Sequence, residues 1–258
     1  MKLICLNTWG GRVFNPLMQF IKDSAKDTDI FCFQEIFKTT ENIKVYEGFR
    51  VNLFNEFSKI LNDHHGYFTS ALDNYITGSF QQNFISFNVS AGLAIFIKKG
   101  LTVKDSGDFF IFGNNNSFNP SDVNSVPRNL QYLSFTFKSK EFMVCNLHGL
   151  WVRGPKIDTE SRIQQSKKIK KFLDKQNCAK IICGDFNLDI NTQSIKILEG
   201  GMENLIKKYK ISTTRSKLFP RSDKFADYIF VSDKVNVLDF KVPNIEVSDH
   251  LPLILEFS

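Results

Sequence analysis

Two oxygen-bearing side chains, Asp185 and Asn187, directly follow a short apolar run in the stretch CGDFNLD, which spans residues 183–189. In an extended segment, residues i and i+2 point the same way, so these two side chains would face one site. A carboxylate and an amide oxygen together can bind a hard cation or orient a water molecule. The alternative is a turn in which both side chains bond to the local backbone.

Polar residues with similar chemical capability stand at the ends of other apolar runs. They are Asn7 in LICLNTWGG, Glu35 in DIFCFQEIF, His148 in FMVCNLHGLW, Asp227 in DYIFVS, and Asp249 with His250 in VSDHLPL. Each of them taken alone could be a cap, a turn residue or an ion-pair partner. Because open α/β sheets carry their sites at strand ends, the recurrence predicts one shared site built from these termini.

The apolar runs themselves are predicted to be strands. They cover residues 3–6, 30–33, 92–97, 132–137, 142–147, 181–183, 228–231 and 253–257. Several are continuously apolar rather than alternating, which is typical of sheets buried on both faces. The segment 133–149 reads as a hairpin with its turn near Ser139 and Lys140.

Segments with helical spacing lie between the strands. One begins at Asn15 as a cap with Pro16 in the first turn, a second covers residues 53–61, and a third covers residues 169–173 and has a lysine-rich face. The order of elements predicts an α/β sandwich of stacked mixed sheets with helices outside. With 258 residues and no linker-like stretch, we expect a single domain over 1–258.

Composition narrows the class of protein. The five cysteines have no Cys-x-x-Cys spacing, and we expect them to be reduced core residues. The start MKLICLNTW lacks the apolar stretch of a signal peptide, and no run of about 18 apolar residues could span a membrane. We therefore expect a cytoplasmic monomer without an integral membrane segment.

The motifs together resemble the metal-dependent endonuclease/exonuclease/phosphatase superfamily, in that family's order and over nearly the full length. They are an Asn after the first strand, a Gln-Glu after the second, Asn-x-His, Gly-Asp-Phe-Asn, Asp-Tyr-Ile-Phe and Ser-Asp-His. GDFN and SDH are the most specific. The resemblance implies a four-layer α-β-β-α sandwich of two packed mixed sheets with helices outside. It also implies one or two Mg²⁺ or Mn²⁺ ions and hydrolysis of a phosphate ester.

The same resemblance implies the metal ligands. Glu35 is the expected main ligand, Asn7 lies beside it, and Asp249 shares the ion. Mg²⁺ prefers a few carboxylates together with water and substrate phosphate, which fits such a sparse set.

Catalytic roles are implied in the same way. Asp185 would be the base or would orient the water, and Asn187 would hold the phosphate or the water. His148 would donate to a phosphate oxygen, and His250 would sit against the scissile phosphate, oriented by Asp227. Hydrolysis builds negative charge on oxygens, so cationic and hydrogen-bonding groups are required there. Whether Asp185 or His250 takes the proton from water stays open.

Five further residues are considered separately. Three of them have two interpretations each, and the other two have no expected catalytic role. Arg128, in VPRNLQY, could reach the phosphate or serve as an ion-pair partner. Trp9 and Trp151 could form walls of the site or stack on a base or sugar, or else pack in the core. His64 and His65 are expected in a turn at the surface.

The substrate does not follow from the family. A net charge of +6, with 17 Lys/Arg against 12 Asp/Glu after residue 160, favours a phosphodiester of nucleic acid. NTWGG lacks the second acidic or Asn residue of repair nucleases and is closer to some sphingomyelinases, and the Phe-rich segment 78–90 could touch a lipid interface. A sphingomyelinase-like or inositol-phosphate phosphoesterase and an inactive binding module are therefore the alternatives.

Overall fold

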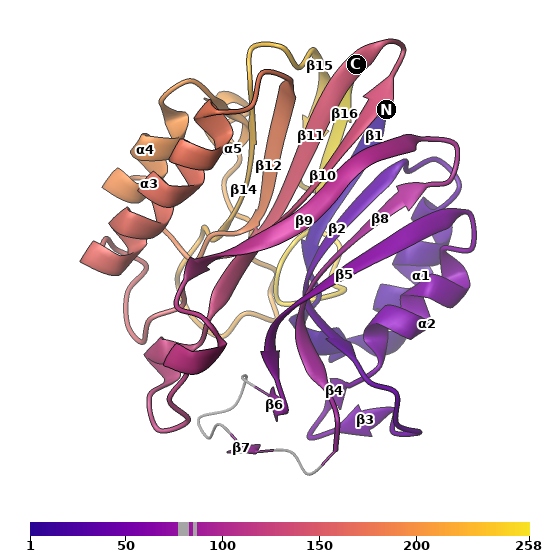
Figure 1. The fold of residues 1–258 in the computed structure, drawn as a ribbon, viewed down its shortest axis with the longest axis vertical. Coiled ribbons are helices and arrows are strands. Elements are labelled where there is room, and N and C mark those ends of the chain that lie inside the picture. The colour runs from indigo at the N-terminus through magenta and orange to yellow at the C-terminus, as the bar shows by residue number, and fades with distance from the viewer. Residues whose placement is uncertain (77–82, 85–86) are drawn as a thin grey trace.

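The computed structural model describes residues 1–76, 83–84 and 87–258, and two six-stranded mixed sheets stack face to face in it (Figure 1). The first sheet has the order β15 (Val237–Lys241), β16 (Leu253–Phe257), β1 (Lys2–Asn7), β2 (Ile30–Lys38), β8 (Ser90–Lys98) and β5 (His64–Asp73). The second has the order β13 (Glu203–Asn204), β14 (Asp227–Val231), β12 (Ala179–Asp185), β11 (Lys140–His148), β10 (Arg128–Phe137) and β9 (Thr102–Phe112).

Each sheet has one parallel pair of strands at its centre. β1 runs parallel to β2 in the first sheet, and β11 runs parallel to β12 in the second, whereas the other pairs within the two sheets are antiparallel. The carboxyl ends of a parallel pair lie at the same edge of the sheet. Both sheets therefore present strand ends from which one site can be assembled.

Helices cover the outer faces of both sheets, which completes the four predicted layers (Figure 1). On one side lie α1 (Phe14–Ser24) and α2 (Leu53–Ile60), and on the other lie α3 (Glu160–Asp174), α4 (Gln193–Glu199) and α5 (Leu205–Lys208). Short elements connect them: η1 (Trp9–Gly11), η2 (Asn115–Ser117), η3 (Val123–Ser125), β3 (Val45–Tyr46), β4 (Phe49–Arg50), β6 (Tyr75–Ile76) and β7 (Asn83–Phe84).

The continuous apolar runs fold as strands because both of their faces are buried. In β1, Leu3 and Cys5 belong to the larger core cluster, whereas Ile4 and Leu6 pack with residues of α1 and α2. A strand between a second sheet and a helix layer has no polar face, so alternation disappears from its sequence. All five cysteines are free and buried, as expected.

A polar bridge joins the two sheets below the strand ends. Gln34 Nε2 on β2 donates to Asn146 Oδ1 on β11 at 2.6 Å, and Asn146 Nδ2 donates to the carbonyl oxygens of Phe33 at 3.0 Å and Ala94 at 3.2 Å. Buried hydrogen bonds are strong in a low dielectric and fix one relative placement of the groups they join. The bridge thereby sets the register of the two sheets next to the site.

Several sequence predictions are confirmed and several are wrong. The sandwich, the predicted strands and the hairpin turn at Ser139 are present. Asn15 does not cap α1, which begins at Phe14 after Val13 without a side-chain cap. His64 is not at the surface: it opens β5, is 6% exposed, and its Nε2 lies 2.9 Å from the Thr28 oxygen.

The membrane-related expectations fall partly outside the described residues. Residues 78–82 and 85–86 of the predicted interfacial segment 78–90 are not described. Within the described ranges, no helix is long and apolar enough to cross a membrane.

Candidate active site

The carboxyl ends of the two parallel strand pairs meet at one edge of the sandwich. Asn7 pairs with Gln34 at the end of β1, and His148 pairs with Asp185 at the ends of β11 and β12. Asn7 reaches across the gap between the sheets, because its Nδ2 donates to Glu35 Oε1 and to Asp185 Oδ2, each at 3.1 Å. The structure thus brings together three side chains that are up to 178 residues apart in the chain.

Glu35 is turned toward the site by a β-bulge inside β2, and it does not end the strand as we expected. The register of β2 with β8 shifts between Phe33 and Ile36, and Glu35 has a φ of 56°. A non-glycine residue in this region costs of order 1–3 kcal/mol and persists only where its surroundings hold it. Here Thr8 Oγ1 lies 2.9 Å from the Gln34 oxygen and 3.2 Å from the Glu35 oxygen. Bulges of this kind re-aim a side chain.

Asp185 and Asn187 meet through a turn rather than through strand alternation, which corrects the geometry we expected. β12 ends at Asp185, and Asn187 has a φ of 55°, which Asn tolerates well. Asn187 N donates to Asp185 Oδ1 at 2.8 Å, while Asp185 Oδ2 faces Asn7 and lies 3.6 Å from His250 Nε2. The two alternatives that the sequence left open therefore hold together, because the local turn places both residues at one site.

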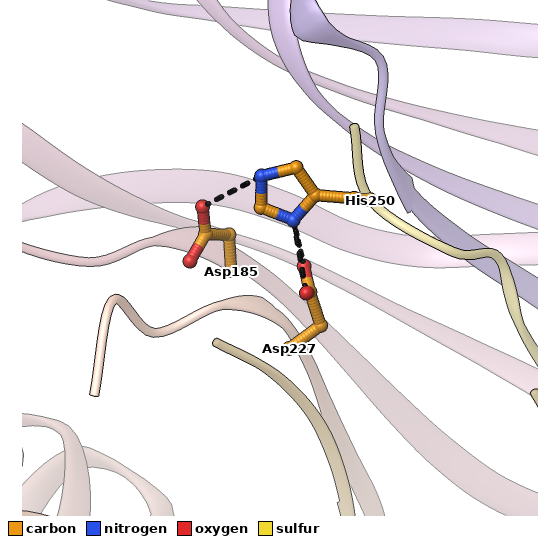
Figure 2. Close-up of side chains that lie close together, drawn as sticks. All are labelled: Asp185, Asp227 and His250. Carbon is orange, nitrogen blue, oxygen red and sulfur yellow. Dashed lines mark hydrogen bonds and ion pairs between the residues drawn. The ribbon is translucent and has the colours of Figure 1, made fainter. Parts of the chain in front are cut away.

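His250 lies between two carboxylates (Figure 2). Its Nδ1 is 2.8 Å and 2.9 Å from the two oxygens of Asp227, and its Nε2 faces Asp185. Ligand atoms of these three residues lie within 4.8 Å of one another, which is close enough for a metal ion. Both oxygens of Asp227 are, however, engaged with Nδ1. The arrangement is that of an imidazole oriented by one carboxylate, with Nε2 directed into the site.

The charges around His250 and Asp185 fix their protonation in opposite directions. Burial and the guanidinium of Arg215 lower the pKa of His250, but Asp227, Asp249 and Asp185 together raise it above its ordinary value. Burial alone would raise the pKa of Asp185, yet the charges of His250 and of Lys156 outweigh it and lower that pKa. A carboxylate that stays ionised therefore faces an imidazole that holds its proton more firmly than usual.

Glu35 and Asp249 supply the chemistry that a hard cation needs. Burial, followed by the like charge of Asp249, raises the pKa of Glu35. Two carboxylates of like charge at one site can be accommodated together by a divalent cation, and their oxygens suit Mg²⁺ or Mn²⁺. Asn7 presents its amide nitrogen to Glu35, while its Oδ1 accepts from Trp9 N at 3.0 Å. Asn7 thus positions the carboxylates here, and its role as a ligand stays a prediction.

His148 and Arg128 lie on neighbouring strands of the second sheet at the same edge. His148 Nε2 is 3.7 Å from Asp185 Oδ2. Burial and then the charge of Arg128 hold the pKa of His148 well below its ordinary value, so the ring is neutral. Arg128 is half-buried, and its Nε has no hydrogen-bond partner among the residues that the structure describes. Burial lowers the pKa of Arg128 although the charges of Glu35 and Asp185 oppose this, and its contact with a phosphate stays a prediction.

The two tryptophans lie in loops that follow site strands. Trp9 opens η1 and is half-buried, with the guanidinium of Arg12 5.6 Å from the centre of its ring. Trp151 follows β11 and is also half-buried. Both positions suit walls of the site, and their contact with a substrate stays a prediction.

Two buried cations that the sequence did not single out complete the site. Lys156 is 5% exposed, and its Nζ donates to Asn187 Oδ1 at 2.6 Å. Burial lowers the pKa of Lys156 to about 8 although the charge of Asp185 opposes this. Arg215 is 8% exposed, its Nη1 contacts His250 Nε2, and it lies 3.7 Å from Asp249 Oδ2. Neither residue follows a strand, so strand-end reasoning could not find them.

Helix α3 holds the loop that carries Lys156. Arg162 is 1% exposed, its Nε donates to the Leu150 oxygen at 3.3 Å, and its Nη1 donates to the Ile157 oxygen at 2.6 Å. Gln165 Oε1 accepts from Leu150 N at 2.8 Å. The side chains of Arg162 and Gln165 on α3 therefore fix the course of this loop.

Comparisons with known proteins bear on the family and the fold of the chain. A model of the Endonuclease/Exonuclease/phosphatase family matches residues 4–250 of the chain. No curated protein matches the sequence. Among solved structures, the mannosyl-6-phosphatase Bt3783 of Bacteroides thetaiotaomicron VPI-5482 has a TM-score of 0.71 at 20% identity, over 100% of this chain and 99% of that chain.

Two other solved structures have the same fold at lower identity. A D. rerio TDP2 humanized by 14 mutations has a TM-score of 0.68 at 14% identity, over 100% of this chain and 98% of that one. The human nocturnin catalytic domain with a bound sulfate anion has a TM-score of 0.68 at 17% identity, over 100% and 93%. Likeness at such identities establishes the fold and leaves the substrate open.

Proposed function

Because the chain belongs to the endonuclease/exonuclease/phosphatase family, whose members are hydrolytic phosphoesterases, we propose that it is a divalent-metal-dependent hydrolase of phosphate esters of nucleic acid. One observation carries the proposal. Asn7 links Glu35 to Asp185 across the two sheets, and Asp185 in turn faces the His250–Asp227 pair. The residues that the family resemblance implies for metal and phosphate are therefore within one site.

A divalent ion held by Glu35 and Asp249 would supply Lewis-acid stabilisation of the phosphoryl oxygens. The chain's own residues supply the rest. Asp185 stays ionised and can accept a hydrogen bond from the attacking water, and Asn187 is held beside it by Gly149 through a bond of 3.2 Å. His250, oriented by Asp227, can offset the charge that develops on the phosphate.

Charge supports nucleic acid as the source of the ester. The chain carries a net charge of +6. A surface groove of about 510 Å³ is lined by three lysines of α3, namely Lys167, Lys168 and Lys171, and by Phe112 at the end of β9. Phe112 pairs with Arg128, so the lysine-lined groove begins next to the site. Lysines along this groove would neutralise backbone phosphates of a bound nucleic acid, and the release of counterions would favour binding.

A panel of substrates tests the proposal. Duplex DNA, single-stranded DNA and RNA, each with and without terminal phosphates, would be compared with sphingomyelin vesicles and inositol phosphates in Mg²⁺. We expect release of product from a nucleic acid and a steep decrease in nucleic-acid affinity between 50 and 200 mM salt, of the order of 10³-fold for about six phosphate contacts. Activity on vesicles alone, insensitive to salt, would reassign the substrate to lipid. No activity on any phosphate ester would favour the binding module.

A further inference from the structure

Three cations surround Asp185 beyond those that the metal-and-water chemistry uses. Arg128 comes from the start of β10, Lys156 from the loop between β11 and α3, and Arg215 from the loop before β14. Lys156 is hydrogen-bonded to Asn187, whose backbone is bonded to Asp185. Arg215 contacts His250 Nε2, the ring nitrogen that faces Asp185. Three separate segments therefore deliver positive charge to one place.

These cations have donor capacity that the described residues leave unused. The Nε atoms of both Arg128 and Arg215 are buried and have no hydrogen-bond partner within residues 1–76, 83–84 and 87–258. Lys156 Nζ donates to an uncharged amide oxygen. Buried donors normally find acceptors, and leaving one unsatisfied costs about 1–3 kcal/mol. An anion that enters the site would supply the missing acceptors.

The number of donors indicates which anion. A phosphomonoester carries close to two negative charges at pH 7 and three terminal oxygens, whereas the internal phosphate of a diester carries one charge and two such oxygens. A metal ion and His250 alone can satisfy two oxygens. Arg128, Lys156 and Arg215 would then have little to bind on a diester, and a third oxygen with a second charge gives them a ligand.

We propose that Arg128, Lys156 and Arg215 form a dianion-binding cluster that fits the site to the terminal phosphate of a phosphomonoester rather than to the internal phosphate of a diester. The inference rests on the proposed function, because it specifies which phosphate ester the site hydrolyses. The competing explanation is that the cations only balance the carboxylates. In that case their removal would impair both classes of ester equally.

Two matched substrates separate these explanations. The catalytic efficiency kcat/KM would be measured with Mg²⁺ for p-nitrophenyl phosphate and bis-p-nitrophenyl phosphate, which share a leaving group and differ in ester class. We expect the wild type to favour the monoester. Arg215→Gln should lower kcat/KM for the monoester about 10- to 100-fold, as for loss of one charge-assisted hydrogen bond, and should affect the diester several-fold less. Lys156→Gln should act in the same direction.

Matched variants guard against a general effect. Arg215→Lys keeps the charge and should recover part of the monoester activity. Lys140→Gln removes a lysine at the opposite end of β11, roughly 25 Å away at 3.3 Å per residue, and should leave both activities unchanged. Circular dichroism and the melting temperature would establish that each variant folds. A wild type that prefers the diester, or equal losses on both esters in Arg215→Gln and Lys156→Gln, would overturn the cluster.

Binding of inorganic phosphate tests the cluster without catalysis. In EDTA, phosphate should raise the melting temperature of the wild type and of Lys140→Gln, and it should raise that of Arg215→Gln much less. No shift in the wild type would refute the cluster. If phosphate binds as expected while neither ester is hydrolysed with Mg²⁺ or Mn²⁺, then the proposed function fails and the cluster stands.

The source of the monoester is resolved by two further substrates. Release of phosphate from a 3′- or 5′-phosphorylated oligonucleotide assigns the cluster to nucleic-acid ends. Release from a hexose 6-phosphate, with none from the oligonucleotides, assigns it to a small phosphorylated molecule. Internal cleavage of the oligonucleotide with its terminal phosphate left intact would contradict the cluster.

Discussion

Replacing Asp227 by Asn removes one charge from the buried pair that orients His250 and changes little else in shape. Both carboxylate oxygens lie within 2.9 Å of Nδ1, and Asp227 and His250 are 3% and 4% exposed. Asn keeps one acceptor oxygen, so the ring can retain its tautomer and orientation. What the variant loses is the negative charge, which contributes to raising the pKa of His250.

The size of the effect follows from the kind of hydrogen bond that is weakened. A bond to a charged group contributes about 1.5–3 kcal/mol, and 1.4 kcal/mol corresponds to a factor of ten. If this free energy is lost from the transition state, kcat/KM of Asp227→Asn falls about 10- to 150-fold at pH 7. A larger loss would indicate that the amide has rotated and forced the wrong tautomer, as in other Asp–His pairs.

The pH profile separates lost charge from lost structure. A group with a raised pKa stays protonated up to that pKa, so activity that needs cationic His250 is lost as the pH rises through it. Asp227→Asn lowers the pKa of His250, and the falling limb of kcat/KM must therefore move to lower pH. The assay is hydrolysis of p-nitrophenyl phosphate in Mg²⁺ between pH 5 and 9, with Asp239→Asn on β15 as the control. A limb that stays in place, or one that moves upward, would refute the cationic role of His250.

Four other outcomes are expected. Glu35→Gln should lower kcat at least 100-fold, and EDTA should abolish wild-type hydrolysis until Mg²⁺ or Mn²⁺ is restored; residual activity in EDTA would argue against the metal. Gly184→Ala should lower the free energy of unfolding in urea by about 3 kcal/mol or more, because its Cβ would lie 2.0 Å from the Leu147 oxygen at a φ of 145°, and a loss below 1 kcal/mol would contradict the close approach of β12 to β11. Burial lowers the pKa of His64, and its Nδ1 has no hydrogen-bond partner in the described part of the chain. The contribution of neutral His64 to stability is thus present above the unfolded-state pKa and is lost as the pH falls below that pKa. Between pH 7 and pH 5, the melting temperature of the wild type should therefore decrease more than that of His64→Gln.

The sequence predicts the central strands because strands buried on both faces consist of uninterrupted apolar residues. Leu3 to Leu6 are all 1% exposed or less, and a run without polar interruption is what a strand between two layers requires. The two long edge strands β5 and β9 escaped prediction for the opposite reason. Most residues of β9 are exposed or half-exposed, and Lys104, Asp105 and Asp108 interrupt it. Charged residues on an edge strand discourage pairing with other chains, and they also make the strand look like a loop.

Polar residues at strand ends predicted the acidic residues of the site, but two of its cationic residues, Lys156 and Arg215, were missed. Asp185 and Asp227 lie at termini of buried strands, where the end of the apolar run gives the position. Lys156 and Arg215 lie in loops whose course is set by tertiary contacts, such as the bond from Arg162 Nη1 to the Ile157 oxygen. A loop residue has no period that fixes its direction, so only the folded chain indicates which lysines and arginines face inward.

The bulge at Glu35 breaks the regular alternation of β2, and the position of the Glu35 carboxylate depends on it. Regular alternation in β2 directs Cys32 and Gln34 between the sheets and Phe33 toward α2, which would place Glu35 on the helix side. The bulge between Phe33 and Ile36 breaks that alternation and lets Asn7 Nδ2 reach the Glu35 carboxylate. No pattern of residue types marks the bulge, because its φ of 56° is maintained by contacts from Thr8 on another element. The residue that we propose as the main metal ligand is therefore one whose placement depends on the completed fold.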